Sequence, residues 1–162
     1  MSENYLEQAS ALYNLSASEY KTDGAELLFN GINLNNLIKK DGSPLKLFYL
    51  PQIAENIERC NNWFNDAFKK NAYDGKNHYS YCTKSNHFLP VVEKTLKCGS
   101  HLEVSSSFDF QLIDELINRQ HISKSTFILC NGFKTDNYIN NICNKIDQGY
   151  KNTLPIIDNN NE

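Results

Sequence analysis

The stretch Tyr79-Ser-Tyr-Cys-Thr-Lys84-Ser-Asn-His-Phe88 ends a short apolar run with a single lysine. The run from His78 to Thr83 predicts a buried strand, and Pro90 fits the first turn of a following helix. Lysine is a poor N-cap residue, so helix capping does not explain Lys84 at this boundary. An amine at the mouth of a strand, among small polar residues, suits an enzyme that holds a carbonyl cofactor as a Schiff base.

The chain after Gly75 repeats this alternation of strand and helix. Strands are expected at His78–Thr83, His101–Ser105, Thr126–Cys130 and Leu154–Ile157, with helices from Pro90 to Gly99, around Leu112–Ile117 and from about Asp136 to Gly149. Strands that are apolar on both faces and joined by helices predict a parallel sheet covered by helices. The expected fold class is therefore α/β.

Polar residues follow the predicted strands. They are Lys84, Ser105, Asn131 and Asp158. In a barrel of parallel strands these ends converge on one face, and that face carries the chemistry. Ser105, Ser106 and Asp158 have a second interpretation, since serine and aspartate are also the residues that cap helices. Ser106 and Asp109 are spaced as a capping box.

The chain divides into three predicted parts, residues 1–44, 45–75 and 76–162. The middle part begins with a predicted strand, Leu45–Leu50, and continues as a long helix that Pro51 opens. Apolar residues recur along this helix at intervals of three and four: Ile53, Ile57, Cys60, Phe64 and Phe68. We expect this stripe to pack into a core.

Composition excludes several classes of partner. The net charge is −3 and the basic pairs Lys39-Lys40 and Lys69-Lys70 are isolated, so no nucleic-acid partner is expected. No apolar run approaches the roughly 20 residues of a membrane helix. The acidic N-terminus does not resemble a secretory signal, which predicts a cytoplasmic protein. Five cysteines without a Cys-x-x-Cys pair argue against a disulfide framework and a metal site, and they predict buried free thiols.

Segments spread along most of the chain occur in the same order in one known family. They are Gly42-Ser-Pro-Leu-Lys-Leu-Phe-Tyr-Leu50, Tyr81-Cys-Thr-Lys84-Ser-Asn86, Leu102-Glu-Val-Ser-Ser106 and Ile128-Leu-Cys-Asn-Gly-Phe-Lys134. From about Leu27 onward the chain resembles the barrel-type (fold type III) pyridoxal-phosphate decarboxylases, which include the ornithine, diaminopimelate and biosynthetic arginine decarboxylases. The segment 128–134 resembles the arginine branch. Cys82 and Glu103 depart from the residues that the wider family carries there.

The resemblance implies the first half of a (β/α)8 barrel, preceded by an N-terminal strand and helix. A closed barrel takes about 250 residues, so the chain is expected to stop before barrel closure and before a C-terminal β domain. By the same resemblance, Lys84 would bind pyridoxal 5′-phosphate covalently, and Asn86, His87 and Glu103 would contact it. Mg²⁺ is a further ion that the family suggests. A purely structural histidine is the alternative for His87.

The implied reaction is decarboxylation of a small-molecule amino acid, L-arginine to agmatine and CO₂, in polyamine and spermidine biosynthesis. The full-length protein would be a homodimer or a higher homo-oligomer, and the 162-residue chain is expected to be inactive alone. The alternatives are an ornithine- or diaminopimelate-type decarboxylase, a non-enzymatic carrier of pyridoxal phosphate, and a regulatory protein of the same fold. A doubly wound open sheet is the alternative fold, but residues 84–90 contain no glycine for a phosphate loop.

Overall fold

The computed structural model describes residues 19–24 and 26–160, and the chain divides into two units, residues 1–47 and 48–162. The first unit contains a small antiparallel sheet. Its strands are β1 (Tyr20–Asp23), β2 (Glu26–Phe29) and β3 (Ile32–Asn33), in that order across the sheet. Asn30 and Gly31 join β2 to β3 with φ values of 48° and 79°. A two-residue hairpin turn requires positive φ at both positions, which asparagine and glycine tolerate.

Helix α2 (Leu34–Asp41) completes the first unit. Asn33 is the N-cap residue of this helix, and its side-chain oxygen accepts a hydrogen bond from the Asn36 N–H at 3.0 Å. The sequence did not indicate the three short strands before it. Strands of two to four residues carry too little periodicity to be recognised.

The second unit contains a parallel sheet, as the sequence predicted. Its strands are β4 (Ser80–Cys82), β5 (His101–Val104), β6 (Ile128–Cys130) and β7 (Thr153–Pro155), and they lie in the order of the chain. The register pairs Tyr81 with Leu102, and Leu102 with Ile128. Since side chains alternate between the faces of a strand, these three residues share one face.

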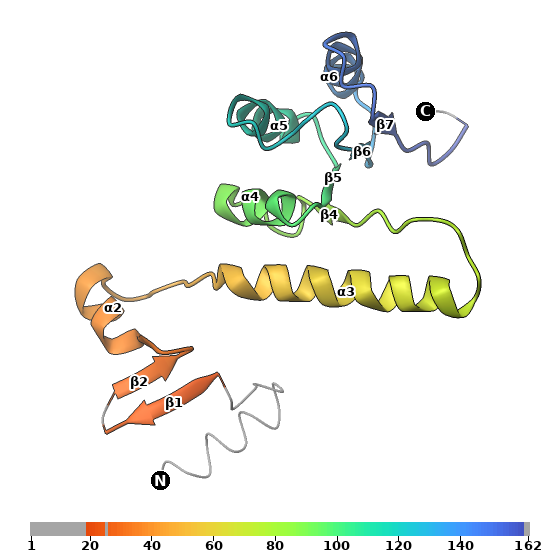
Figure 1. Ribbon diagram of the computed structural model, residues 1–162. Helices are drawn as coiled ribbons and strands as arrows, with labels where there is room; N and C mark the ends of the chain where they lie inside the picture. The colour runs from red at the N-terminus through yellow and green to blue at the C-terminus, as the bar shows by residue number, and fades with distance from the viewer. Residues whose placement is uncertain (1–18, 25, 161–162) are drawn as a thin grey trace. The chain divides into compact units, whose positions relative to one another are not determined.

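Three helices connect consecutive strands: α4 (Leu89–Lys97), α5 (Asp109–Asn118) and α6 (Asp136–Asp147). Figure 1 shows all three on the same side of the sheet. Parallel crossovers almost always have one hand, so strands that follow chain order place their helices on one face. The core fills the space between the sheet and these helices: Val92, Leu102, Val104, Phe110, Ile113, Leu116, Ile122, Ile128, Cys130, Tyr138 and Ile142. The opposite face of the sheet is covered by none of these three helices.

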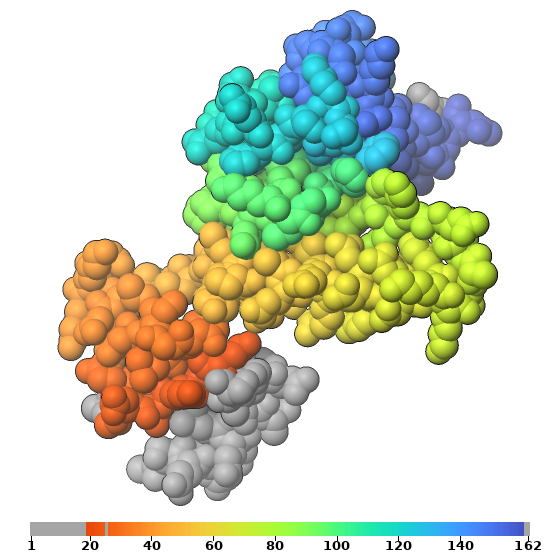
Figure 2. All heavy atoms as spheres, in the orientation of Figure 1, coloured from red at the N-terminus to blue at the C-terminus, as the bar shows by residue number. Residues whose placement is uncertain are grey.

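Helix α3 (Leu50–Lys70) precedes the sheet, with Pro51 in its first turn. It lies alongside α4, and the side chains of the two helices touch (Figures 1 and 2). The predicted strand Leu45–Leu50 is wrong, because residues 45–49 are in no strand and Leu50 already belongs to α3. None of the strands that the structure describes lies in register with the apolar run at 45–50, and a strand is stable only in a sheet.

The apolar stripe of α3 is only partly in a core. Ile57 is 4% exposed, whereas Phe64 is 47% exposed and Trp63 beside it is 65% exposed. The expectation that the whole stripe packs into a core is therefore wrong for its second half. The first half faces α4, and α4 extends for only nine residues, so the rest of the longer helix has less to pack against.

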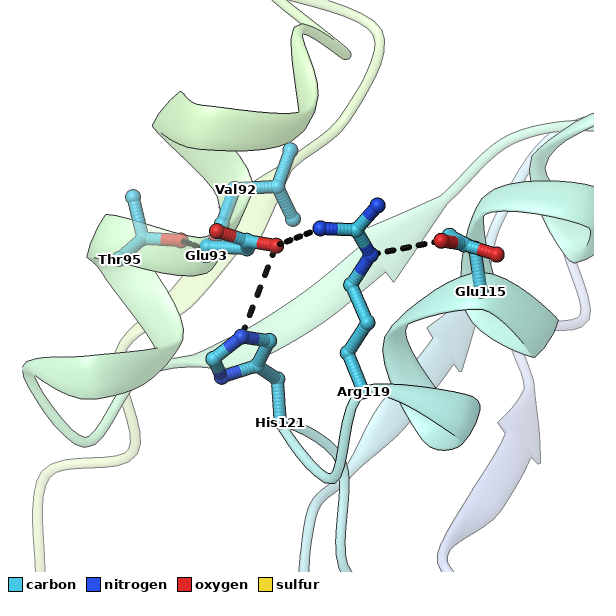
Figure 3. A network of polar contacts seen from close by, with 6 residues as sticks. All are labelled: Val92, Glu93, Thr95, Glu115, Arg119 and His121. Atoms are coloured by element: carbon cyan, nitrogen blue, oxygen red, sulfur yellow. Dashed lines mark hydrogen bonds and ion pairs between the residues drawn. The ribbon is translucent and has the colours of Figure 1, made fainter.

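A polar network joins α4 to the end of α5 on the outside of the helical layer (Figure 3). The guanidinium of Arg119 lies 3.3 Å from Glu93 and 2.6 Å from Glu115, and His121 Nε2 lies 3.5 Å from the same Glu93 oxygen. The arginine and Glu115 are half exposed, so these pairs add little stability. They fix which residues of the two helices meet.

The cysteines of the described chain are all free thiols. Cys130 is buried as expected, but Cys143 is exposed because α6 turns it away from the sheet. Within residues 19–24 and 26–160, no helix has the length and apolar character needed to cross a membrane.

Candidate functional site

Lys84 lies in a tight turn directly after β4. Ser85 closes this turn, since its N–H and its hydroxyl both donate to the Cys82 carbonyl, at 3.2 and 2.8 Å. Thr83, between them, is fully buried and donates its N–H to the Glu103 carbonyl at 2.9 Å. Lys84 itself is exposed and makes no hydrogen bond or ion pair with another described residue. Its amine is therefore accessible, whereas the backbone on either side is fixed.

The loop after Lys84 is held by Asn86 and Tyr81. The Tyr81 hydroxyl donates to the Asn86 carbonyl at 2.8 Å, and the Asn86 side-chain oxygen accepts the Phe88 N–H at 2.9 Å. This second bond is a local turn that leads the chain into α4. His87 is exposed between them. Asn86 thus shapes the loop, and its side-chain nitrogen and the imidazole of His87 follow Lys84 by two and three positions.

Glu103 and Asn131 meet on the open face of the sheet. The Asn131 side-chain nitrogen donates to Glu103 Oε1 at 3.2 Å. Cys82 is the register partner of Glu103, so the carboxylate lies on the strand next to the one that ends at Lys84. Parallel strands bring their carboxyl ends to one edge, so Lys84 follows β4 at the same edge at which Glu103 and Asn131 meet. Glu103 is half-buried there.

Gly132 allows the turn after β6 to lie against the end of β5. Its φ is +77°, and a Cβ at this position would collide with the Ser105 carbonyl oxygen. The fully buried Tyr138 of α6 holds the same two strand ends, because its hydroxyl lies 3.1 Å from the Val104 carbonyl and 3.0 Å from the Asn131 carbonyl. Burial raises the pKa of this phenol, so it remains a hydrogen-bond donor.

Lys134 ends the segment 128–134 that carries part of the family resemblance. It is half-buried, and its ammonium donates to the Gly132 carbonyl at 2.6 Å and to the Ile156 carbonyl. It therefore joins the loop after β6 to the segment after β7. The sequence carried no signal for this role, because both acceptors are main-chain atoms.

Ser106 and Asp109 are bonded, but the prediction that they cap the helix is wrong, because α5 begins at Asp109 and its N-cap residue is Phe108, without a side-chain cap bond. Asp109 accepts the Ser106 N–H at 3.0 Å and the Ser106 hydroxyl at 3.1 Å. Asp109 also reaches Thr83, on another strand, at 3.1 Å. Sequence reasoning missed this second contact, since the two residues are 26 positions apart.

A polar cavity of about 220 Å³ lies at the opposite end of the sheet, where the strands begin. It is lined by Asn61, Asn65, Asn77, His78, Tyr79, Gly99 and His101. Among the residues that the structure describes, no group of three or more histidine, cysteine, aspartate or glutamate side chains could hold a metal ion. The described side chains therefore give no support to an Mg²⁺ site built from such a group.

Comparison with known proteins gives two distant relatives. No family model matches the chain. It is 26% identical over 120 residues to the biosynthetic arginine decarboxylase of Phocaeicola vulgatus, an alignment that covers 74% of this chain and 19% of that protein. It is 25% identical over 107 residues to the protein of the same name from Bacteroides thetaiotaomicron, covering 65% of this chain and 17% of the relative.

The chain is distantly related to proteins named arginine decarboxylase. It spans less than a fifth of the length of these curated relatives. The comparisons support a decarboxylase relation and leave the role of each site residue open. The structure adds that Lys84, Glu103 and Asn131 share one sheet edge, with Asn86 and His87 in the loop beside it.

Proposed function

We propose that this chain carries the cofactor lysine of a decarboxylase that depends on pyridoxal 5′-phosphate and acts on a basic amino acid, L-arginine before others. The observation that carries the proposal is the accessible amine of Lys84 at the carboxyl edge of a parallel sheet. The distant relation to arginine decarboxylases supports it. We also propose that the full-length protein is a homodimer that acts in the cytoplasm, in polyamine biosynthesis.

Each residue at this edge has a proposed role. Lys84 would hold the cofactor through its amine, and the half-buried Glu103 would face it from the neighbouring strand. Asn131 would orient the Glu103 carboxylate, since its amide donates to one carboxylate oxygen. When bound, the cofactor supplies an electron sink for the carbanion left after loss of CO₂. His87 and the side-chain amide of Asn86 would contact the cofactor or the substrate.

The described residues fit one end of this cofactor. An exposed, unpaired lysine suits the aldehyde, because a free amine can condense with a carbonyl. The N–H groups of Ser105 and Ser106, at the next strand end, already donate to Asp109. They are not available to the phosphate, which would need other donors.

The test is the attachment site of pyridoxal phosphate. Borohydride reduction of the full-length chain with the cofactor, followed by peptide mass mapping, should place the label on Lys84. Lys84→Ala and Lys84→Arg should lose the label, because neither side chain forms a reducible adduct there. Lys97→Ala removes an exposed lysine at the end of α4 and should leave the label in place. A label on another residue, or no label in the parent protein, would contradict the proposal.

A non-enzymatic carrier of pyridoxal phosphate is the second candidate. It is favoured by the exposure of Lys84, since a carrier must also release its cofactor. Release of CO₂ from carboxyl-labelled arginine, ornithine and diaminopimelate by the full-length protein separates the two functions. Turnover of one of the three identifies the decarboxylase and its substrate, whereas a labelled Lys84 without turnover identifies the carrier.

A further inference from the structure

Asp109, the first residue of α5, bonds to two different strand ends with one carboxylate. Its Oδ2 accepts the N–H groups of Ser105 and Ser106, each at 3.0 Å, and the Ser106 hydroxyl at 3.1 Å. Its Oδ1 accepts the Thr83 hydroxyl at 3.1 Å. The carboxylate thus joins the end of β5 to the end of β4.

Thr83 precedes Lys84 and is fully buried. Its hydroxyl lies 3.1 Å from both the Asp109 carboxylate and the Glu103 carbonyl. The carbonyl already accepts the Thr83 N–H at 2.9 Å, and the carboxylate forms the stronger, charge-assisted bond. The bond therefore restrains the side-chain torsion of Thr83 and, with it, the backbone that leads into Lys84.

Helix capping does not account for this arrangement. A cap satisfies N–H groups in the first turn of its own helix, whereas Oδ2 of Asp109 accepts the N–H groups of Ser105 and Ser106, which precede α5. The bond from Oδ1 leaves the helix and reaches a residue on another strand, 26 positions earlier. That contact joins the first residue of α5 to the residue that follows β4.

We propose that Asp109 is the positioning residue of the Lys84 site. Through the Thr83 hydroxyl it sets the direction in which β4 presents the amine toward Glu103 and Asn131. The inference rests on the proposed function, in which Lys84 holds an aldehyde cofactor. Asp109 acts through Thr83 and touches neither cofactor nor substrate in this role.

The experiment removes the bond at each end in the full-length chain. Thr83→Val keeps the shape of the side chain and removes the hydroxyl, Thr83→Ser keeps the hydroxyl, and Asp109→Asn removes the charge. The readouts are the rate of borohydride-trapped attachment of pyridoxal phosphate at Lys84 and the visible circular dichroism per bound cofactor, which reports its orientation. Small misplacement of reacting groups is costly, so Thr83→Val and Asp109→Asn should slow attachment by about tenfold or more. Thr83→Ser should behave as the parent.

Thr95→Val is the matched control. Thr95 is also a fully buried threonine, and its hydroxyl donates to the Val92 carbonyl within α4 at 2.8 Å. Its loss removes a comparable bond away from Lys84, so the attachment rate and the dichroism should not change. Equal rates for Thr83→Val and Thr95→Val would overturn the inference.

A readout without the cofactor keeps the two proposals separate. The amides of residues 83 and 85 are hydrogen-bonded to the Glu103 and Cys82 carbonyls, so their exchange should become faster in Thr83→Val and in Asp109→Asn, but not in Thr95→Val. Unchanged exchange at residues 83 and 85 would overturn the positioning role, even if the cofactor labels the parent protein. Failure of the parent protein to label, with exchange changed as expected, would overturn the proposed function alone.

Discussion

Gly132 shows how closely two strand ends approach at the candidate site. Its φ is +77°, and the Ser105 carbonyl oxygen occupies the space that a Cβ would need. Because that oxygen belongs to the backbone at the end of β5, it cannot move aside as a flexible side chain would. Asn131 precedes this glycine and bonds to Glu103, so the turn geometry also places the carboxylate's partner.

Gly132→Ala should therefore destabilise the protein by more than the strain of a positive φ alone would, because the new Cβ also collides with the Ser105 carbonyl oxygen. A residue with a Cβ in the left-handed region costs about 1–2 kcal/mol. Gly99→Ala is the control, since Gly99 has φ +80° and open space around the Cβ position. In urea denaturation, Gly132→Ala should lower the free energy of unfolding clearly more than Gly99→Ala does. Equal losses would mean that the Ser105 contact carries no cost.

At this scale, the sequence placed Lys84 and Asn131 at strand ends, because strand boundaries follow from periodicity. It did not predict the contact of Asp109 with Thr83, or the bond of Lys134 to the Ile156 carbonyl. These contacts join positions 22 to 26 residues apart, and only the packed sheet brings them together. Spacing along a chain reports contacts within one turn or one helix, such as the bond from Ser106 to Asp109.

At the scale of the elements, a pair of histidines joins the segment before β4 to the start of β5. His78 Nδ1 lies 3.2 Å from His101 Nε2, and His101 Nδ1 accepts the Phe127 N–H at 3.2 Å. Since Nδ1 of His101 is an acceptor, the neutral ring carries its proton on Nε2 and donates it to His78. The cavity beside the pair is lined by asparagines, Tyr79 and Gly99, with no carboxylate to balance a charged imidazole.

Burial, and then the neighbouring His78, lower the pKa of His101 from its ordinary value of 6.5. In the interval below pH 6.5 the unfolded chain binds more protons at this site than the folded chain, so stability should fall as the pH decreases from 6.5. Denaturation between pH 7.5 and about 5 measures this loss. His101→Asn should flatten the curve, whereas His87→Gln, which changes an exposed histidine, should not. A parent curve without a decrease below pH 6.5 would contradict the expectation.

Helix α3 shows what periodicity cannot predict. The spacing of Ile53, Ile57 and Phe64 correctly indicated a helix, but it could not say how much of the stripe would be covered. Coverage depends on the partner, and Ile57 is buried while Phe64 is 47% exposed. The wrong strand at 45–50 has a similar cause, since an apolar run becomes a strand only where another strand lies beside it.

At the scale of the whole molecule, strand order follows chain order in the parallel sheet, and the three crossover helices cover one face. The sequence predicted this sheet because alternation of strand and helix admits few other arrangements. On the open face, Glu103, Leu129 and Leu154 are register partners, and Leu154 is 39% exposed. The sequence could not predict what the first unit would bury, because its short strands and α2 have no clear core pattern.

The two units should differ in local stability. The described residues of the first unit, 19–24 and 26–47, include no buried residue, whereas β5 and β6 contain residues that are fully buried. Local opening costs less where little apolar surface is buried. In hydrogen exchange, the amides of β5 and β6 should therefore exchange at least about a hundredfold more slowly than those of β1 and β2, equivalent to ~3 kcal/mol. Val104→Ala should accelerate exchange in β5 and β6 and leave β1 and β2 unchanged, because the cavity it creates lies in the core of the second unit. Similar protection in both units of the parent, or acceleration of the hairpin by this variant, would show that the chain unfolds as one cooperative unit.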